Sequence, residues 1–249
     1  MSFFEGIAKA LHAALPGVVN ADSAIVVIAA LFVTLLLGLM GLLVRRRLAQ
    51  ADGGLIPDVG LSTRNVAELL VEMLAGLAEQ NMGPHWRRYF PIIGSIFFFV
   101  LVANLVGLIP GVEGATRNAN VTWAWAAISF IAHQYVGIRE HGFSYVNHFL
   151  GPSLFDLHIR GKHIHVRMLF PIYAPIELLS HFSRLFTLAV RLLANMFADH
   201  LVVTVWISLV AIGVPAIFMG LGVMVAFLQA YVFALLSMIY IGLALEEAH

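Results

Sequence analysis

The chain alternates long apolar stretches with short polar ones. The stretch 24–44 carries no charged residue, and as an α-helix it would reach about 31 Å, the thickness of the hydrocarbon core of a bilayer. Apolar stretches of similar length follow at 89–109 and 121–138, and two longer ones occupy 171–212 and 216–245. This pattern predicts an all-α polytopic membrane protein with about five membrane-crossing helices.

The segment between the first two apolar stretches has a different hydrophobic periodicity. Its apolar residues recur every three or four positions, at 66, 69, 70, 73, 74 and 77, whereas Glu68, Glu72 and Glu79 lie off this stripe. The pattern predicts an amphipathic helix over 62–82 that lies along the cytoplasmic membrane surface. Asn65 followed by Glu68 resembles a capping box, which predicts that the helix begins near Asn65.

The C-terminal third is too long to stand upright in a membrane. A helix of about 40 residues from Pro171 would be about 60 Å long, twice the thickness of the bilayer core. Gly213-Val214-Pro215 interrupts the apolar run, which then continues to Leu245. Either this helix is strongly tilted, or it is bent and its early part is cytoplasmic. We therefore expect a long, tilted helical hairpin that turns at Gly213-Val214-Pro215.

Together these elements predict one integral membrane domain over residues 1–249. Its expected parts are an outer surface segment (1–23), a first span (24–44), an amphipathic surface helix (62–82), second and third spans (89–138), a cytoplasmic loop (139–170) and the long tilted hairpin (171–245).

Composition supports a membrane location and narrows the chemistry. Hydrophobic residues make up 61% of the chain and charged residues 11%, whereas soluble domains carry about 25% charged residues. An ordinary soluble enzyme is therefore excluded. The chain has no Cys and no P-loop, dinucleotide or GxSxG motif. His158, His163 and His165 stand beside Lys162 without an HExxH pattern, so we expect a solvated basic loop there, with no metal and no cofactor.

Net charge is zero, with 14 basic and 14 acidic residues, and gives no indication of nucleic-acid binding. The distribution is uneven, because ten basic residues fall in loops on one side and two, Lys9 and Arg117, on the other. The positive-inside rule then places the N-terminus outside and the C-terminus in the cytoplasm, which favours a bacterial inner membrane. The remaining two, Arg184 and Arg191, lie within an apolar stretch.

A polar stripe runs along the first helix of the hairpin. At 100° per residue its members fall within an arc of about 80°, with His200 facing away: Glu177, His181, Arg184, Arg191, Asn195 and Asp199. Ionisable side chains inside a membrane cost about 2.5–3.5 kcal/mol or more each, and they commonly line ion pathways. Alternatively, Glu177, Arg184 and Asp199 neutralise one another along a single helix.

Arg191 resists that simpler interpretation. Its neighbours one turn away, Thr187, Leu188, Ala194 and Asn195, include no acid, and a guanidinium does not lose its proton in proteins. A carboxylate on another subunit would supply the missing counter-ion. If that carboxylate changed its protonation state, the pair would form a proton-transfer device.

Three segments resemble subunit a of the F-type rotary ATP synthase over essentially the whole order of spans. They read SRLFTLAVRLLANMFADHL (183–201), QAYVFALLSMIYI (229–241) and NLVGLIPG (104–111). By this resemblance, Arg191 matches the family's essential arginine, which faces a ring of c subunits. Asn195 and Gln229 match polar residues beside it, and Glu177 matches an acid upstream.

The chain also departs from the family pattern. By the resemblance, the position of His200 is Glu in many bacterial members and His in mitochondrial ones. Its usual titratable partner, seven residues before Gln229, is Gly222 here. Asp199 stands where Gly is frequent. We therefore expect that Asp199 supplies the acid missing at Gly222.

The resemblance implies a stator subunit with two offset half-channels. Asp199, His200, Asn195 and Gln229 would form the outer path, Glu177 and His181 the cytoplasmic path, and Arg191 would stand between them. The implied partners are the c-ring, the peripheral stalk b subunits, the rest of the synthase, lipid and protons. The chain would not be an enzyme by itself, since the nucleotide chemistry would belong to other subunits.

Three other classes of membrane protein also have to be considered for these residues. A secondary cation/proton transporter would also bury ionisable groups, but it usually shows inverted repeats, and an intramembrane metalloprotease needs HExxH. A purely structural subunit gives no reason for Arg191. His133 and Gln134 either line the cytoplasmic path or form hydrogen bonds between helices, and Asn104 is expected to bridge helices.

Overall fold

The computed structural model describes residues 6, 21–50, 62–109, 112, 114–142, 155–159, 162–166, 170–209 and 213–246. The predicted outer segment 1–23 lies almost entirely outside them. The elements are α2 (Ala21–Gln50), α3 (Thr63–Met82), η2 (Gly83–His85), α4 (Trp86–Gly107), η3 (Ala115–Arg117), α5 (Ala119–His141), β1 (Phe155–Ile159), β2 (Lys162–Val166), α6 (Phe170–Leu209) and α7 (Val214–Glu246). The predicted helical class is confirmed.

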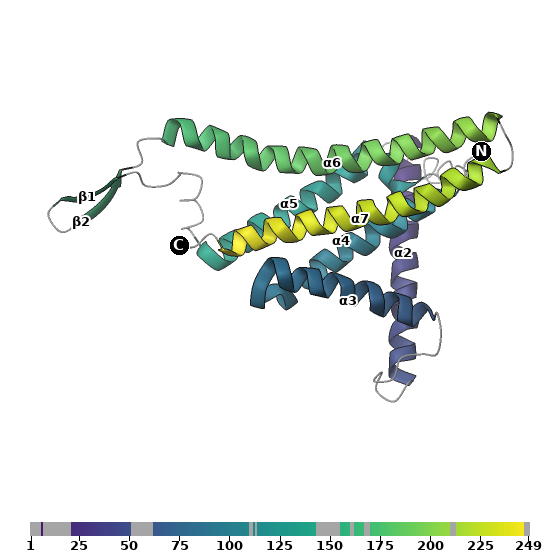
Figure 1. Ribbon diagram of the computed structural model, residues 1–249, viewed down its shortest axis with the longest axis horizontal. Helices are drawn as coiled ribbons and strands as arrows, with labels where there is room; N and C mark the ends of the chain where they lie inside the picture. Colours follow the sequence, from purple (N-terminus) through teal and green to yellow (C-terminus); the bar gives the residue numbers. More distant parts are fainter. Residues whose placement is uncertain are drawn as a thin grey trace.

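The hairpin of α6 and α7 runs the length of the molecule and crosses the direction of α2 (Figure 1). α4 packs along α7, and α5 contacts both helices of the hairpin. The two hairpin helices contain 40 and 33 residues, lengths that require tilting in a bilayer. Gly213, at the turn, has φ 94°, a backbone conformation that glycine adopts without steric cost.

Four stretches of the described chain are long and apolar enough to cross a membrane: Ala24–Arg46, Arg64–Gly107, Leu179–Leu209 and Val214–Leu245. The second of these stretches, Arg64–Gly107, comprises α3, η2 and α4. Hydropathy alone therefore does not separate the predicted surface helix α3 from the predicted membrane span α4. α5 is not among the four, and it carries the polar residues His133 and Gln134. A fifth crossing by α5 therefore stays a prediction.

The amphipathic helix α3 covers the predicted 62–82 to within one residue, but its first residues differ from the capping box that the sequence pattern indicates. Its N-cap is Ser62, whose Oγ accepts a hydrogen bond from the Arg64 backbone N–H at 3.3 Å. The predicted capping box at Asn65 is therefore wrong, because Asn65 lies inside the helix. Leu74 and Ala78 are fully buried, whereas Leu69 is 67% exposed. Part of the predicted apolar stripe thus faces the protein and part faces its surroundings.

The predicted cytoplasmic loop contains a short antiparallel hairpin that sequence analysis missed. β1 pairs with β2, with Phe155 opposite Val166 and His158 opposite His163 in the Cα register. The signal was present, because apolar and polar residues alternate in both segments with the period of a strand. His158, His163 and His165, for which the sequence predicts a solvated loop, thus belong to these strands.

Polar contacts join the helix ends. The Thr116 hydroxyl donates to Asn104 Oδ1 at 2.9 Å, and both residues are buried, so the expectation that Asn104 bridges neighbouring elements is confirmed. At the other end of α4, Glu140 accepts from the Tyr89 hydroxyl at 2.6 Å and from Arg88 Nη1 at 3.1 Å. The hydrogen bond from Tyr89, followed by the charge of Arg88, lowers the pKa of Glu140.

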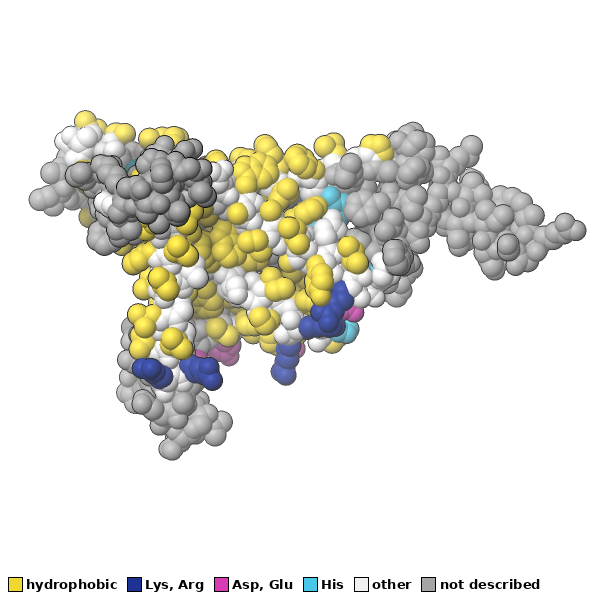
Figure 2. Space-filling view, turned by 180° about the vertical axis from the view of Figure 1, so that it is seen from behind, with side chains coloured by type: hydrophobic (Ala, Val, Ile, Leu, Met, Phe, Trp, Pro, Cys, Tyr) yellow, Lys and Arg dark blue, Asp and Glu magenta, His cyan; other side chains and the backbone are white. Residues whose placement is uncertain are grey.

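The basic side chains visible in Figure 2 lie along the lower edge of the molecule, below a broad hydrophobic band. The exposed basic residues of the described chain include Arg45 and Arg46 at the end of α2, Arg87 and Arg88 at the start of α4, and Arg139 at the end of α5. This separation of an apolar band from a basic edge is what the positive-inside rule predicts for a cytoplasmic surface.

The contact between α3 and α7 depends on a glycine. A Cβ at Gly242 would collide with the backbone carbonyl of Asn81, whereas a Cβ at Gly220 on the same helix would meet nothing within 4 Å. We expect Gly242→Ala to destabilise the protein by about 1–3 kcal/mol, the usual cost of overpacking, and Gly220→Ala to stabilise it by up to about 1 kcal/mol, the difference in helix propensity. Unfolding of the purified chain in mixed micelles measures both. Equal stabilities of the two variants would contradict this packing.

Candidate functional site

The centre of the polar stripe is a contact between the two helices of the hairpin. Asn195 Nδ2 on α6 donates a hydrogen bond of 2.6 Å to Gln229 Oε1 on α7, and Gln229 is only 4% exposed. The sequence resemblance matched both residues to polar positions beside the arginine, and the structure joins them to each other. A buried amide pair of this kind links two helices where lipid offers no hydrogen-bond partner.

Arg191 lies one turn before Asn195 on α6 and is half-buried. Within the described part of the chain, no carboxylate forms an ion pair with it. The sequence has no acid one helical turn from Arg191, and no described acid of another helix forms an ion pair with it. A fixed positive charge in an apolar setting requires either a counter-ion from another molecule or hydration by water.

Beyond Asn195, toward the hairpin turn, lie Asp199 and His200, both half-buried. Oδ2 of Asp199 is buried and has no hydrogen-bond partner among the described residues. The proposed alternative, in which Asp199 and Arg184 neutralise each other along one helix, fails on distance. Fifteen residues of helix separate them by about 22 Å.

Gly222 on α7 explains its departure from the family pattern. It is buried, and a Cβ at this position would lie 2.7 Å from Cδ2 of Leu108, at the end of α4. Such a contact is too close without a movement of Leu108, so a histidine or glutamate here would require repacking. A titratable side chain at this position would therefore require the Leu108 side chain to move.

On the other side of Arg191, three helices bring polar rings together. His181 on α6 stacks on His133 of α5, with ring centroids 5.6 Å apart and planes at 8°. Both rings are almost completely buried, at 3% and 2% exposure. Tyr240 of α7 lies 6.2 Å from the His133 ring and 5.1 Å from Arg184 Cζ. Glu177 lies earlier on α6, and its side chain is outside the described set.

Sequence analysis left His133 undecided and missed Tyr240, Ser129 and Ser237. The two serines are hydrogen-bonded across α5 and α7 at 2.7 Å and are buried. A spacing of four residues from Ser129 to His133, and of three from Ser237 to Tyr240, places each pair on one helix face. That spacing was available in the sequence, but only the packing of α5 against the hairpin shows that the two faces meet.

The site thus defines a class of protein: a polytopic membrane protein whose long helical hairpin carries two groups of buried polar side chains on either side of an arginine. Comparison with known proteins gives the family. The sequence model of the ATP synthase A chain family matches residues 23–242, and the chain belongs to that family. The resemblance seen in the motifs around Arg191 and Gln229 is confirmed.

Named relatives cover most of the chain. ATP synthase subunit a of Bdellovibrio bacteriovorus is 38% identical over 211 residues, which are 84% of this chain and 86% of that protein. ATP synthase subunit a 1 of Syntrophotalea carbinolica is 41% identical over 217 residues, 87% of this chain and 84% of the relative. ATP synthase subunit a of Geotalea uraniireducens is 37% identical over 249 residues, 100% and 97% respectively. The chain is therefore a membrane-embedded subunit of an ATP synthase.

The bond between Asn195 and Gln229 can be tested with a double-mutant cycle. We expect Asn195→Ala and Gln229→Ala to show a coupling of about 0.6 kcal/mol, and at most about 1.7 kcal/mol, as for other interhelical hydrogen bonds in membranes. Unfolding in mixed micelles measures it. Ser208→Ala paired with Gln229→Ala is the control, because the Ser208 hydroxyl donates only to the Val205 carbonyl of its own helix. Strict additivity of the first pair would show that the bond contributes nothing.

Proposed function

We propose that the chain is the proton-translocating stator subunit of a rotary F-type ATP synthase, with Arg191 as the essential charge between two offset half-channels that meet a ring of c subunits. One observation carries this proposal. Along α6, Arg191 lies about 12 Å from Asp199 on one side and about 15 Å from His181 on the other, at 1.5 Å per residue, and it has no acidic partner in the described chain.

The outer half-channel would be formed by Asp199, His200, Asn195 and Gln229. Asp199 Oδ2 and Gln229 Nε2 are buried without a hydrogen-bond partner among the described residues. Leaving such atoms unpaired costs about 1–3 kcal/mol each. The presence of these unpaired polar atoms therefore favours a role that needs a free lone pair or donor, such as passing a proton to water or to the ring.

The cytoplasmic half-channel would be formed by Glu177 and His181, extended by His133. The stacked imidazoles of His133 and His181 join α5 to α6, and His133 Nε2 has no hydrogen-bond partner in the described chain. Imidazole accepts and donates protons near neutral pH. This contact favours a path-lining role for His133 over a purely structural one.

The mechanism follows from the charge of Arg191. A proton entering from outside neutralises a carboxylate of the ring, which can then rotate through lipid. When the ring has carried this group round to the cytoplasmic half-channel, the proton leaves. Arg191 favours the ionised form of the carboxylate that passes it, and its positive charge repels protons that would otherwise leak between the half-channels. Each proton crossing 100 mV releases about 2.3 kcal/mol.

Partners and orientation belong to the same proposal. We place the chain in a bacterial inner membrane, with the N-terminus outside and the C-terminus in the cytoplasm, because the exposed arginines cluster at one edge (Figure 2). The c-ring and the peripheral stalk b subunits would be its neighbours. Nucleotide chemistry would reside in other subunits, and the proposed mechanism requires no metal or cofactor. Family membership favours this function over the secondary cation/proton transporter.

Substitution of the arginine tests the central step. We expect Arg191→Ala to reduce proton-driven ATP synthesis in membrane vesicles to background while the complex still assembles. Arg191→Lys should also fail, because an ammonium is a compact charge that shifts its pKa readily. Arg139→Ala is the matched control, since Arg139 is exposed at the end of α5. Normal ATP synthesis by an assembled Arg191→Ala complex would refute the proposal.

A second pair of variants tests the outer path. Asp199→Asn keeps the size of the side chain but cannot titrate, so we expect a large loss of ATP-driven proton pumping. Asp199→Glu should restore most of it, because the carboxylate is retained and only its reach changes. Quenching of a pH-sensitive dye in inverted vesicles measures both. Undiminished pumping by Asp199→Asn would show that Asp199 is not an obligatory relay.

A further inference from the structure

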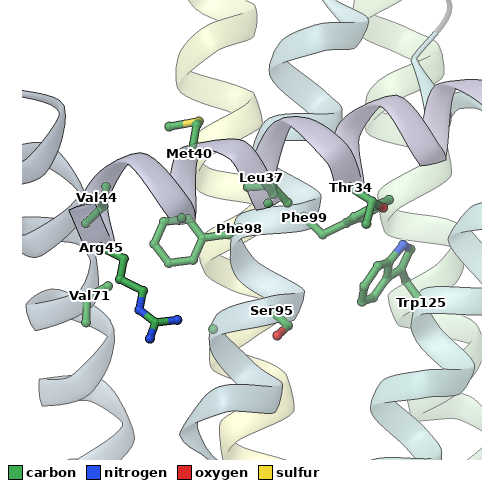
Figure 3. Close-up of a pocket in the computed structure, with 14 residues that line it drawn as sticks. Thr34, Leu37, Met40, Val44, Arg45, Val71, Ser95, Phe98, Phe99 and Trp125 are labelled. Atoms are coloured by element: carbon green, nitrogen blue, oxygen red, sulfur yellow. The ribbon is translucent and has the colours of Figure 1, made fainter. Parts of the chain in front are cut away.

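A groove whose lining includes no residue of the proposed proton path lies between α2 and α4. Its volume is about 640 Å³, within the range of roughly 300–1,000 Å³ that is usual for ligand sites. Figure 3 shows α2 along one side, with α3, α4 and Trp125 of α5 forming the remainder. The walls include Leu37, Met40, Val44, Val71, Phe98 and Phe99.

The interior of the groove offers apolar surface. Its two hydroxyl groups already donate within their own helices, from Thr34 Oγ1 to the Ala30 carbonyl at 2.8 Å and from Ser95 Oγ to the Pro91 carbonyl at 2.7 Å. Neither donor is left over for a ligand. The interior therefore favours the binding of a hydrocarbon chain over that of a polar molecule, which would lose hydrogen bonds to water there.

One end of the groove is positively charged. The Arg45 guanidinium hangs from α2 into the space between α3 and α4 (Figure 3). No acid of the described chain forms an ion pair with it, whereas Arg64 on the neighbouring α3 pairs with Glu68 at 2.7 Å. Arg45 thus supplies a cation without a described acidic partner at the boundary between the apolar band and the basic edge.

The groove has the length of one leaflet. From Thr34 to Arg45 the helix rises about 17 Å, and half of a hydrocarbon core of about 30 Å is about 15 Å. A ligand with its charge at Arg45 and its tail along the groove would therefore end near the middle of the bilayer, at Trp125.

Three glycines keep the groove open. A Cβ added at Gly38, Gly41 or Gly94 would meet nothing within 4 Å. Glycines in membrane helices commonly permit the close approach of another helix, but here no described atom occupies the space they leave. They also cost helix stability relative to alanine, by about 1 kcal/mol each. The space is thus available to a molecule from outside the chain.

We propose that this groove is a binding site for an anionic phospholipid of the leaflet at the Arg45 end, with an acyl chain along Phe98 and Phe99 and the phosphate at the Arg45 guanidinium. Basic pockets between membrane helices recognise anionic head groups in this way. The acyl chain of a bound lipid gains little by moving from the bilayer into the groove, because both surroundings are apolar. The charge of Arg45 therefore determines which lipid the groove binds.

The test uses the assembled ATP synthase in phosphatidylcholine vesicles containing a trace of phosphatidylglycerol with a diazirine near the end of one acyl chain. After irradiation, mass spectrometry locates the labelled residues. We expect label on the segment containing Phe98 and Phe99 and at Trp125. Arg45→Gln should lower it about fivefold, which is what one basic residue at an anionic lipid surface contributes, and Arg45→Lys should retain it.

Filling the groove provides an independent variant. Gly94→Leu should abolish labelling of the groove without disturbing assembly, because its Cβ meets open space. Gly220→Leu, which also points into open space but on α7, should leave labelling unchanged, as should Arg139→Gln. Copurification of the complex checks that each variant assembles.

Three results would overturn the proposal. One is equal labelling by a phosphatidylcholine probe of the same design, since the charge of Arg45 would then select nothing. Another is labelling that persists at full strength in Gly94→Leu. The third is absence of lipid label together with a photo-crosslink from benzoylphenylalanine at Leu37 to another membrane subunit, which would show that a protein covers the groove.

Discussion

A guanidinium that keeps its proton must be held inside an apolar helical hairpin, and the surrounding structure follows from this constraint. Arg191 cannot become neutral as a buried lysine or carboxylate can. Its cost in the membrane has to be offset by water or by a charge from outside the described chain, because no acid of that chain reaches it. The face of α6 that carries Arg191 therefore has to be accessible to water or to an outside partner.

The remaining helices meet this requirement by packing on the other faces of the hairpin. α4 lies along α7, and α5 contacts both α6 and α7. The Asn195–Gln229 bond and the His133–His181 stack use polar contacts between helices, since apolar side chains gain little by leaving lipid for protein. Close approaches at glycines, as at Gly242 beside Asn81, add van der Waals packing where side chains would prevent it.

Packing also accounts for the unusual residues of this chain. The end of α4 brings the Leu108 side chain against Gly222, and the half-buried Asp199 lies on the facing helix of the hairpin. α2 packs on α4 around the buried Val33, and farther along α2 the two helices border a groove with Arg45 at its rim. The contact of α4 with α7 at Gly222 is thus close, whereas the space beside Gly38, Gly41 and Gly94 is open.

The sequence by itself determined the helical class, the long hairpin, the isolated Arg191 and the family, because each depends on local properties: run length, helical period and motif spacing. It did not determine that Ser62 caps α3, that His133 stacks on His181, or that Ser129 and Tyr240 belong to the same polar region. Those depend on which faces of distant helices meet. Hydrophobic periodicity shows that a face is apolar, but in a membrane both lipid and protein satisfy such a face, and only the tertiary structure decides between them.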